Sequence, residues 1–298
     1  MEQQERSVRR GYLEVISGYV LWGTLPIFWK LLDHVNAFEV LLHRILWCGA
    51  WSASYFLITG RNPLRVLRAL WLTRPAFVWI CSALIVSANW LSYIYAVISG
   101  NILQASLGYL LCPIMIVLLG VIFFKETMTA LQKAALVCCI AGVVYASLMA
   151  GGFPWLSVLI GGTFALYSTI KKFLGTDGLT ALLSDTLLLT PLAVLIMGFL
   201  AWKGESAFLS VNLSTDILLV TAGLATLLPL YLFIQGTITI PYQSVGFLQF
   251  IIPFIAFMLG VFVYGEPFSR DQGITFGLII IGVGCYIASL LMRSRMRR

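Results

Sequence analysis

Four ionisable side chains fall inside long apolar stretches of this sequence, where charge is expensive. Glu39, His43 and Arg44 lie in one apolar stretch, and Asp185 lies early in another. Glu39 and His43 are four residues apart, so a helix places them on one face. A carboxylate beside Arg or His can carry a coupling proton, clamp two helices together or bind a charged substrate. We predict that these four residues are coupling or gating charges, and a purely structural clamp stays open as the alternative.

Polar and aromatic side chains in the middle of apolar stretches form a second group of candidates. Asn89 and Tyr93 are four residues apart and share one helix face. An Asn in hydrocarbon needs a hydrogen-bond partner, which is either a ligand or another helix. Trp22 and Tyr167 are placed either to stack on a ligand or to pack in the core. The predicted substrate-facing residues are Trp22, Asn89, Tyr93, Ser106, Tyr109, Tyr167 and Gln249.

Two prolines stand midway along apolar stretches and predict local breaks in their helices. A proline has no N–H and clashes with the carbonyl four residues earlier, which belongs to Tyr109 for Pro113 and to Gln249 for Pro253. Unwound backbone at membrane depth is tolerated only against protein or a water-filled cavity. We therefore predict hinges that line a cavity, although a packing kink would explain either proline alone. The predicted hinge residues are Gly108, Pro113, Gly246 and Pro253.

The sequence contains no pattern typical of an enzyme. No nucleophile–base pair, phosphate-binding loop or metal-ligand spacing occurs, and all six cysteines lie in apolar stretches without a C-x-x-C spacing. We therefore expect no catalysis, no cofactor, no metal and no disulfide framework. The net charge of +7 does not indicate nucleic-acid binding. The expected partners are a small organic solute, the lipid bilayer and, as a hypothesis, protons.

Composition identifies the elements that must position these residues as membrane helices. Of the 298 residues, 60% are apolar and 10% are charged, against about 25% charged in soluble domains. A bilayer core of about 30 Å needs about 20 apolar residues per helix. Ten such segments lie near residues 11–32, 37–59, 75–99, 101–124, 129–149, 153–172, 179–201, 215–235, 241–264 and 272–292. We predict an all-α polytopic membrane protein with ten transmembrane helices.

The distribution of Lys and Arg predicts the orientation. With the N-terminus inside, the inner segments hold 15 of these residues and the outer segments hold three, while Arg44 lies within a helix. Such an excess is the positive-inside pattern. Both termini are therefore predicted to be cytoplasmic, which also requires an even number of spans.

The sequence contains an internal repeat whose two copies align in one register without a gap. The pattern Pro-x6-Gly-x5-Glu-x5-Gln occurs from Pro113 to Gln132, including Glu126, and again from Pro253 to Gln272, including Glu266. Five helices per half is an odd number, so the second half must be inverted in the membrane. Inverted repeats are typical of secondary transporters, whose site lies at the repeat interface. The predicted halves are residues 11–149 and 153–292, and a symmetric bundle without transport is the alternative.

The chain resembles the drug/metabolite transporter superfamily, with two EamA-type repeats, and within it the RarD-like group. The resemblance rests on motifs along the whole chain: Trp22-Gly23 with Pro26 and Lys30, Glu39 with His43-Arg44, Asn89-Trp90 with Tyr93, Ser106 to Tyr109, Pro113, Glu126, Tyr167 with Lys172, and Leu248-Gln249 with Pro253. It implies ten helices in the bacterial inner membrane and a cavity lined by the first, third, fourth, sixth, eighth and ninth. The chain differs from the group at Cys112, Asp185 and Phe250, where Asn, Glu and Tyr are common.

The predicted function is a secondary transporter that exports small metabolites or drugs by alternating access. Proton coupling is a hypothesis based on Glu39 beside His43. An uncoupled facilitator or importer, and a non-transporting or lipid-handling membrane protein, are the alternatives. The sequence does not indicate the substrate or the oligomeric state.

Overall fold

The computed structural model describes residues 2–296 apart from 100, 151–152 and 266, and these residues form helices joined by turns and loops. Seven helical segments are long and apolar enough to cross a membrane, which makes the chain an all-α multi-pass membrane protein. They are Ala76–Ala96 in α4, Leu103–Phe123 in α5, Ala130–Met149 (α6), Gly178–Trp202 (α8), Leu213–Thr237 (α9), Tyr242–Val263 across α10, α11 and η1, and Arg270–Met292 in α12.

Three further long helices are not among these seven segments. They are α1 (Glu2–Lys30), α2 (Ala37–Ile58) and α7 (Trp155–Leu174). Helix α2 contains the predicted charges Glu39, His43 and Arg44, and α7 ends with two lysines. The remaining helices extend from Ala76 to Ile98 (α4), Ile102 to Phe123 (α5), Tyr242 to Gln249 (α10), Ile251 to Met258 (α11) and Arg270 to Met296 (α12), with α3 at Pro63–Trp71 and the π-helix η1 at Leu259–Val263.

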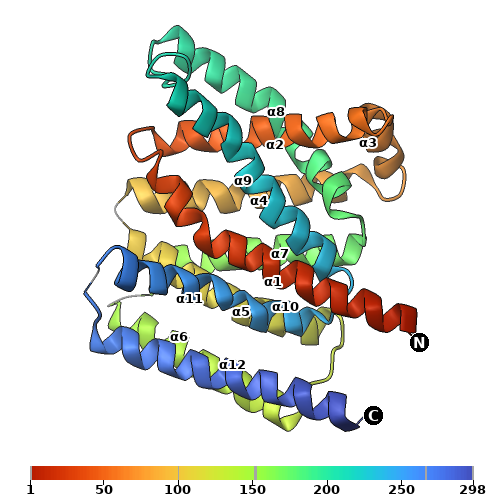
Figure 1. Ribbon diagram of the computed structural model, residues 1–298, viewed down its shortest axis with the longest axis vertical. Coiled ribbons are helices and arrows are strands. Elements are labelled where there is room, and N and C mark those ends of the chain that lie inside the picture. The colour runs from red at the N-terminus through yellow and green to blue at the C-terminus, as the bar shows by residue number, and fades with distance from the viewer. Residues whose placement is uncertain (1, 100, 151–152, 266, 297–298) are drawn as a thin grey trace.

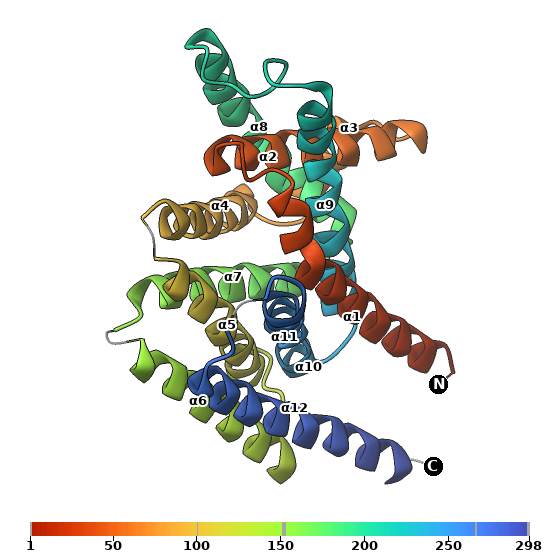
Figure 2. The same cartoon turned by 60° about the vertical axis from the view of Figure 1, so that its left-hand side comes forward.

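The long helices lie side by side with α2 and α8 near one edge and α6 with α12 at the other (Figure 1). Both chain ends lie at the same end of this bundle in both views (Figures 1 and 2). We call this the terminal end and the other the opposite end. Helix α1 therefore runs from the terminal end to the opposite end, and α2 returns.

Local signals explain why the helices begin where they do. Asn36 caps α2 by accepting a hydrogen bond from the backbone N–H of Phe38. Thr129 and Gln132 form a reciprocal capping box at the start of α6. Ser269 and Gln272, the matching positions of the second repeat, make the same two bonds at the start of α12. The repeated Gln of the sequence pattern is therefore a capping residue in both halves.

The short helix α3 is an element that the sequence analysis missed. It begins after Asn62, whose side chain accepts from two backbone N–H groups, with Pro63 in its first turn. Leu67 and Leu70 are buried. Nine residues are too few to span a bilayer, so a search for long apolar segments passes over this helix.

The two mid-helix prolines have different effects. Helix α5 continues through Pro113 to Phe123, whereas the ninth predicted segment is divided into α10, which ends at Gln249, and α11, which contains Pro253. The same segment ends in a π-helical turn, a feature common at functional sites. The backbone irregularity that the sequence predicts for both halves is thus found in the second.

Helices α6 and α12 pack through reciprocal glycine contacts. A Cβ on Gly142 would lie 3.0 Å from the carbonyl oxygen of Thr275, and one on Gly282 would lie 2.7 Å from that of Ala135. The register of the internal repeat aligns Ala135 with Thr275 and Gly142 with Gly282. Each helix therefore places its glycine against the carbonyl oxygen of the matching position on the other helix.

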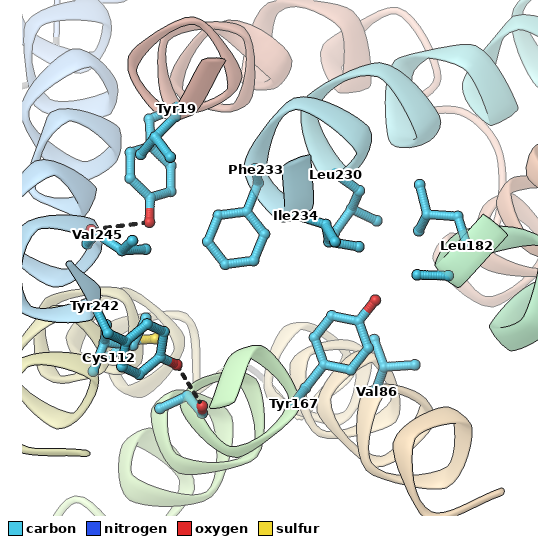
Figure 3. Close-up of a cluster of buried hydrophobic side chains, with 14 of the residues drawn as sticks. Tyr19, Val86, Cys112, Tyr167, Leu182, Leu230, Phe233, Ile234, Tyr242 and Val245 are labelled. Carbon is cyan, nitrogen blue, oxygen red and sulfur yellow. Dashed lines mark hydrogen bonds between the residues drawn. The ribbon is translucent and has the colours of Figure 1, made fainter. Parts of the chain in front are cut away.

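The main apolar core lies between α1, α7, α9 and α10, towards the terminal end. Figure 3 shows Tyr19 on one side of Phe233 and Tyr167 on the other, with Tyr242 beside Cys112. The hydroxyl of Tyr19 donates to the carbonyl of Val245 (3.0 Å), and all three tyrosines are at most 1% exposed. Buried tyrosines satisfied in this way fix the spacing of the helices they join.

Candidate functional site

The guanidinium of Arg44 lies among aromatic rings from several helices. Its Nε donates to the Thr226 hydroxyl at 2.9 Å, and its central carbon is 4.8 Å from the ring centroid of Trp29 and 5.9 Å from that of Trp90. These distances are typical of cation–π contacts. Tyr93 stands one turn after Trp90 on α4, and its ring meets that of Tyr109. The Arg44 cluster consists of Trp29, Arg44, Trp90, Tyr93, Tyr109 and Thr226.

The two tyrosines of the Arg44 cluster are partly exposed. Their rings meet edge to face with centroids 5.9 Å apart. Tyr93 is 36% exposed and Tyr109 is 38% exposed, although α5 packs against α4, α6, α7 and α10. Ser106 lies one turn before Tyr109 on the same face and is also exposed. Tyr109 and Ser106 therefore form an exposed strip on α5, a helix with neighbours on several sides.

Five helices supply the Arg44 cluster, namely α1, α2, α4, α5 and α9. Trp29 stands near the end of α1, and Arg44 is the eighth residue of α2, about 10 Å along its axis from the opposite end. Four of these helices belong to the first predicted half and α9 belongs to the second. Residues predicted separately on α2, α4 and α5 therefore meet in one place.

Asp185 lies in a second polar cluster, which is completely buried. Its Oδ1 is 2.8 Å from Lys171 Nζ, and its Oδ2 accepts from the Tyr167 hydroxyl at 2.9 Å. Ser82 donates to Oδ1 at 3.3 Å. Asp185, Lys171 and Tyr167 are each 1% exposed. This Asp185 cluster (Ser82, Tyr167, Lys171 and Asp185) joins α4, α7 and α8, and it includes Tyr167, which the sequence analysis assigns to the substrate.

Glu39 and His43 are directed towards the loop at residues 206–208. The Glu39 carboxylate accepts from Ser206 Oγ at 2.7 Å and from the backbone N–H groups of Ala207 and Phe208 at 2.8 and 3.3 Å. His43 Nδ1 accepts from Trp47 Nε1 at 3.1 Å, and its Nε2 is 4.0 Å from Glu39. Glu39 therefore fastens the start of α2 to the loop between α8 and α9.

Three other predicted substrate residues are engaged in packing. Asn89 donates from Nδ2 to the Ile160 carbonyl (2.7 Å) and so links α4 to α7. Trp22 packs edge-on against Phe164 and Phe233, with centroids 5.4 and 5.9 Å away. Gln249 is buried at the end of α10, where its amide oxygen has no hydrogen-bond partner among the described residues.

The predicted hinge glycines are sites of close helix packing. A Cβ on Gly108 would lie 3.0 Å from Ile160 in α7, and one on Gly246 would lie 2.7 Å from the carbonyl oxygen of Pro113. Gly246 therefore brings α10 directly against the proline of α5. Whether the helices pivot there remains a prediction.

The terminal end is fastened at the turn before α10. Glu126 accepts from the backbone N–H groups of Tyr242 (2.6 Å) and Gln243 (2.8 Å), which caps the N-terminus of α10. Lys172 Nζ donates to the carbonyls of Thr237 and Ile240 at 2.9 and 2.7 Å. The sequence analysis includes Glu126 in the repeat but does not foresee this cap. Its repeat partner, Glu266, lies outside the described residues.

Lys172 and Lys30 occupy corresponding positions at the two ends of the bundle. Lys172 lies over the ring of Phe124 at 5.5 Å, and Lys30 lies over the ring of Tyr264 at 4.0 Å. Phe124 and Tyr264 are matching positions of the internal repeat, because each directly precedes the residue before the repeated Glu. The ends of α1 and α7 thus meet related partners.

Trp29 is the member of the Arg44 cluster that the sequence analysis missed. It directly precedes Lys30 at the end of an apolar stretch, a position typical of an interfacial anchor. Pairwise spacing along one helix could not connect it with Arg44, because the two residues lie on different helices. Within the described residues there is no group of three His, Cys, Asp or Glu side chains able to hold a metal.

The Arg44 cluster has the properties of a binding site, because a cation without an ion-pair partner among the described residues lies among aromatic rings, two of which are partly exposed. The Asp185 cluster has those of a lock, because its charges neutralise each other out of contact with water. The Arg44 cluster therefore offers a solute positive charge and flat apolar surface together.

Comparison with known proteins places these features in a family context. The EamA-like transporter family matches residues 9–148. The chain is 34% identical to "Uncharacterized transporter YojE" of Bacillus subtilis over 93% of each chain. It is 31% identical to "Protein RarD" of Salmonella typhi, and 28% identical to "Chloramphenicol-sensitive protein RarD" of Pseudomonas aeruginosa, in both cases over 97% of this chain and 98% of the relative. A solved crystal structure shares the fold with a TM-score of 0.71 at 21% identity, covering 95% of this chain and 98% of that chain.

Proposed function

This chain belongs to the EamA-like transporter family, as a RarD-like member of the drug/metabolite transporter superfamily, and from that membership we propose that it is a secondary transporter exporting small organic metabolites or drugs. The observation that carries this proposal is the contrast between the two ends of the molecule. The Arg44 cluster is partly exposed near the opposite end, while the Asp185 cluster and the caps at the α10 turn fasten the terminal end. Alternating access requires one closed end and one open end in each state.

We propose ten membrane helices in two inverted halves, residues 11–149 and 153–292. The reciprocal contacts of Gly142 and Gly282 support this arrangement, as do the matching capping boxes of α6 and α12. The position of both termini at one end supports an even number of spans (Figure 1). The excess of Lys and Arg there supports a cytoplasmic terminal end in the bacterial inner membrane.

In the proposed cycle the Asp185 cluster acts as the inner gate. To open the terminal end, α7 and α8 must separate so that the bond between Lys171 and Asp185 breaks. The apolar core that contains Tyr19, Tyr167 and Tyr242 must also loosen. Separation of this pair is the step to which a proton gradient would be coupled in a proton-driven exporter. Gly108, Pro113, Gly246 and Pro253 would serve as the hinges of this motion.

Solute counterflow in proteoliposomes tests the proposal. Amino acids, small aromatic metabolites and chloramphenicol-like amphipaths form the panel, with and without an imposed pH gradient. We expect saturable, trans-stimulated uptake that Tyr109→Leu lowers at least about tenfold, as expected from loss of a central contact. Tyr55→Leu is the matched control, because Tyr55 is 53% exposed on the outer part of α2. Non-saturable uptake, or equal effects of the two variants, would contradict the proposal.

Lipid handling is a second candidate, favoured by an apolar groove in the side of the bundle. The groove lies between α1 and α9 and has a volume of about 390 Å³. It is lined by Leu21, Thr24, Leu25, Ile27, Phe28, Leu31, Ala225, Leu228 and Pro229. Scrambling of a fluorescent lipid in the same proteoliposomes, without solute counterflow, would favour this candidate over export of solutes.

A further inference from the structure

Arg44 is a positive charge for which the described part of the chain provides no counter-ion. The ion pairs there join Arg10 to Glu14, Lys171 to Asp185, Lys203 to Glu205, and each histidine to a neighbouring acid. Arg44 takes part in none of them. An arginine in the hydrocarbon region is expensive unless it is paired or faces water, so the location of Arg44 calls for a partner from outside the chain.

The acidic groups on the helices packed against α2 are already occupied. Glu39, on α2 itself, accepts from the loop at residues 206–208. Asp185 on α8 is paired with Lys171. Asp216, near the start of α9, accepts from the backbone N–H of Leu209 at 2.7 Å. Any of these carboxylates would have to break its present bonds before it could neutralise Arg44.

The described residues use only part of the hydrogen-bond donors of Arg44. The Nε–H is used by Thr226, and the two terminal nitrogens make no hydrogen bond to the described residues. Guanidinium nitrogens in a fixed fork match the two oxygens of a carboxylate. Trp29 and Trp90 present their rings to the guanidinium at 4.8 and 5.9 Å, and Tyr93 stands one turn from Trp90 on α4 with its ring against that of Tyr109.

We propose that the Arg44 cluster binds the carboxylate of a small organic monoanion and packs its apolar part against the rings of Trp29 and Trp90. A single guanidinium matches one negative charge, whereas a phosphate dianion is usually held by more than one cation. This inference names the substrate class of the proposed transporter and so rests on that proposal. It makes charge, more than shape, the first criterion of selection.

Equilibrium binding to the detergent-solubilised full chain tests the inference independently of transport. Titration calorimetry compares probes that share one skeleton but differ in charge, namely benzoate, benzamide and benzylamine, together with hexanoate and indole-acetate. We expect benzoate to bind at least about tenfold more tightly than benzamide, the difference typical of a charge-assisted hydrogen-bond pair. Benzylamine is expected to bind least, because Arg44 repels it.

Two substitutions assign that selectivity to the guanidinium. Arg44→Gln removes the charge and is expected to abolish the preference for benzoate over benzamide. Arg44→Lys keeps the charge without the fork and is expected to retain a weakened preference. Arg74→Gln is the matched control, because Arg74 also lies over an aromatic ring, that of Phe173 at 5.3 Å, but is exposed. Gel filtration verifies that each variant is folded.

The outcomes separate this inference from the proposed function. Equal binding of benzoate and benzamide by the unsubstituted chain overturns the inference, and so does the absence of binding by every carboxylate. Unchanged benzoate affinity in Arg44→Gln also overturns it. Carboxylate binding that depends on Arg44 without any counterflow would contradict transport and leave the anion site standing. Counterflow of neutral solutes that Arg44→Gln leaves unchanged would support transport and contradict the anion site.

Discussion

Arg44 and Asp185 occupy equivalent places and are stabilised in opposite ways. Each is the eighth residue of its helix, α2 or α8, and each lies about 10 Å along that helix from its first residue. The neighbouring helix supplies Lys171 to Asp185 and Trp29 to Arg44. The charge of Asp185 is therefore neutralised by Lys171, whereas Arg44 is surrounded by aromatic rings that do not neutralise its charge.

This difference distinguishes a charge that stabilises the structure from a charge that is available to a ligand. The pair Lys171–Asp185 is complete, excludes water and joins two helices. Arg44 is half-buried, and its surroundings stabilise a cation without cancelling its charge. The two charges therefore carry different expectations for mutation: substitution of Asp185 mainly affects stability, and substitution of Arg44 mainly affects binding.

The largest expected effect is the loss of stability when the buried pair is broken. Asp185→Asn leaves the Lys171 ammonium buried without a counter-ion, and removing one member of a buried pair costs about 3–5 kcal/mol. The free energy of unfolding in mixed micelles titrated with SDS measures this loss. Arg44→Met is expected to change the same quantity by less than about 1 kcal/mol, within the range of substitutions that create no buried unpaired charge.

A double substitution sharpens this prediction. Lys171→Met combined with Asp185→Leu removes both charges and is expected to regain most of the lost stability, because apolar replacements of a buried pair are commonly neutral or stabilising. If the double variant were as unstable as Asp185→Asn, the pair would not be the source of the effect. Equal losses for Arg44→Met and Asp185→Asn would remove the distinction between the two sites.

An intermediate effect on stability is expected where α2 packs against α9. A Cβ on Gly223 of α9 would lie 2.4–2.7 Å from Trp47 and the backbone of Cys48. Gly223→Ala must therefore move α9 away from α2, at a cost of about 1–3 kcal/mol. Because Thr226 is one turn further along α9, carboxylate affinity is expected to fall as well. Unfolding titrations and the benzoate titration measure the two effects.

Gly49 provides the matched control on the side of the Asp185 cluster. A Cβ there would meet the side chains of Thr186 and Thr190 at 3.3 Å, and these can move. Gly49→Ala is expected to change stability by less than about 1 kcal/mol, because the gain in helix propensity offsets the tighter contact. A larger loss for Gly49→Ala than for Gly223→Ala would show that the α2–α8 contact is the tighter one.

The smallest expected effect concerns the hydrogen bond that orients Arg44. Thr226→Val removes the acceptor of the Arg44 Nε–H and is expected to weaken benzoate binding about three- to tenfold, the value of one such bond. Thr221→Val is the control: the hydroxyls of both threonines donate to the carbonyl four residues earlier, but Thr221 does not contact Arg44. Equal effects of the two variants would assign the loss to the helix backbone.

The sequence predicts the helices well because their signals are local. The predicted segment 37–59 corresponds to α2 at Ala37–Ile58, and 179–201 corresponds to α8 at Gly178–Trp202, since a cap such as Asn36 or Asp177 marks each start. The division of the ninth segment at Phe250 is less predictable. Pro113 and Pro253 look alike in the sequence, but α5 is packed on several sides and remains continuous through its proline.

The candidate site is predictable only in part, because it depends on which helices meet. Arg44, Tyr93 and Tyr109 are predicted from their depth and helix face, and these three converge. Tyr167 satisfies the same criteria, but its hydroxyl meets Asp185, a partner on another helix. Periodicity identifies the residues that share a helix face, and only the packing of the helices decides which neighbour that face meets.

The cap on α10 has a consequence for the order in which the protein is assembled. Glu126 precedes Tyr242 by 116 residues, so during synthesis the carboxylate enters the membrane long before the backbone that it caps. The first turn of α10 thus emerges from the ribosome towards an acceptor that is already in place. The later half of the chain is completed on the earlier one, and a polypeptide that began after residue 152 would lack the group that secures its own helix.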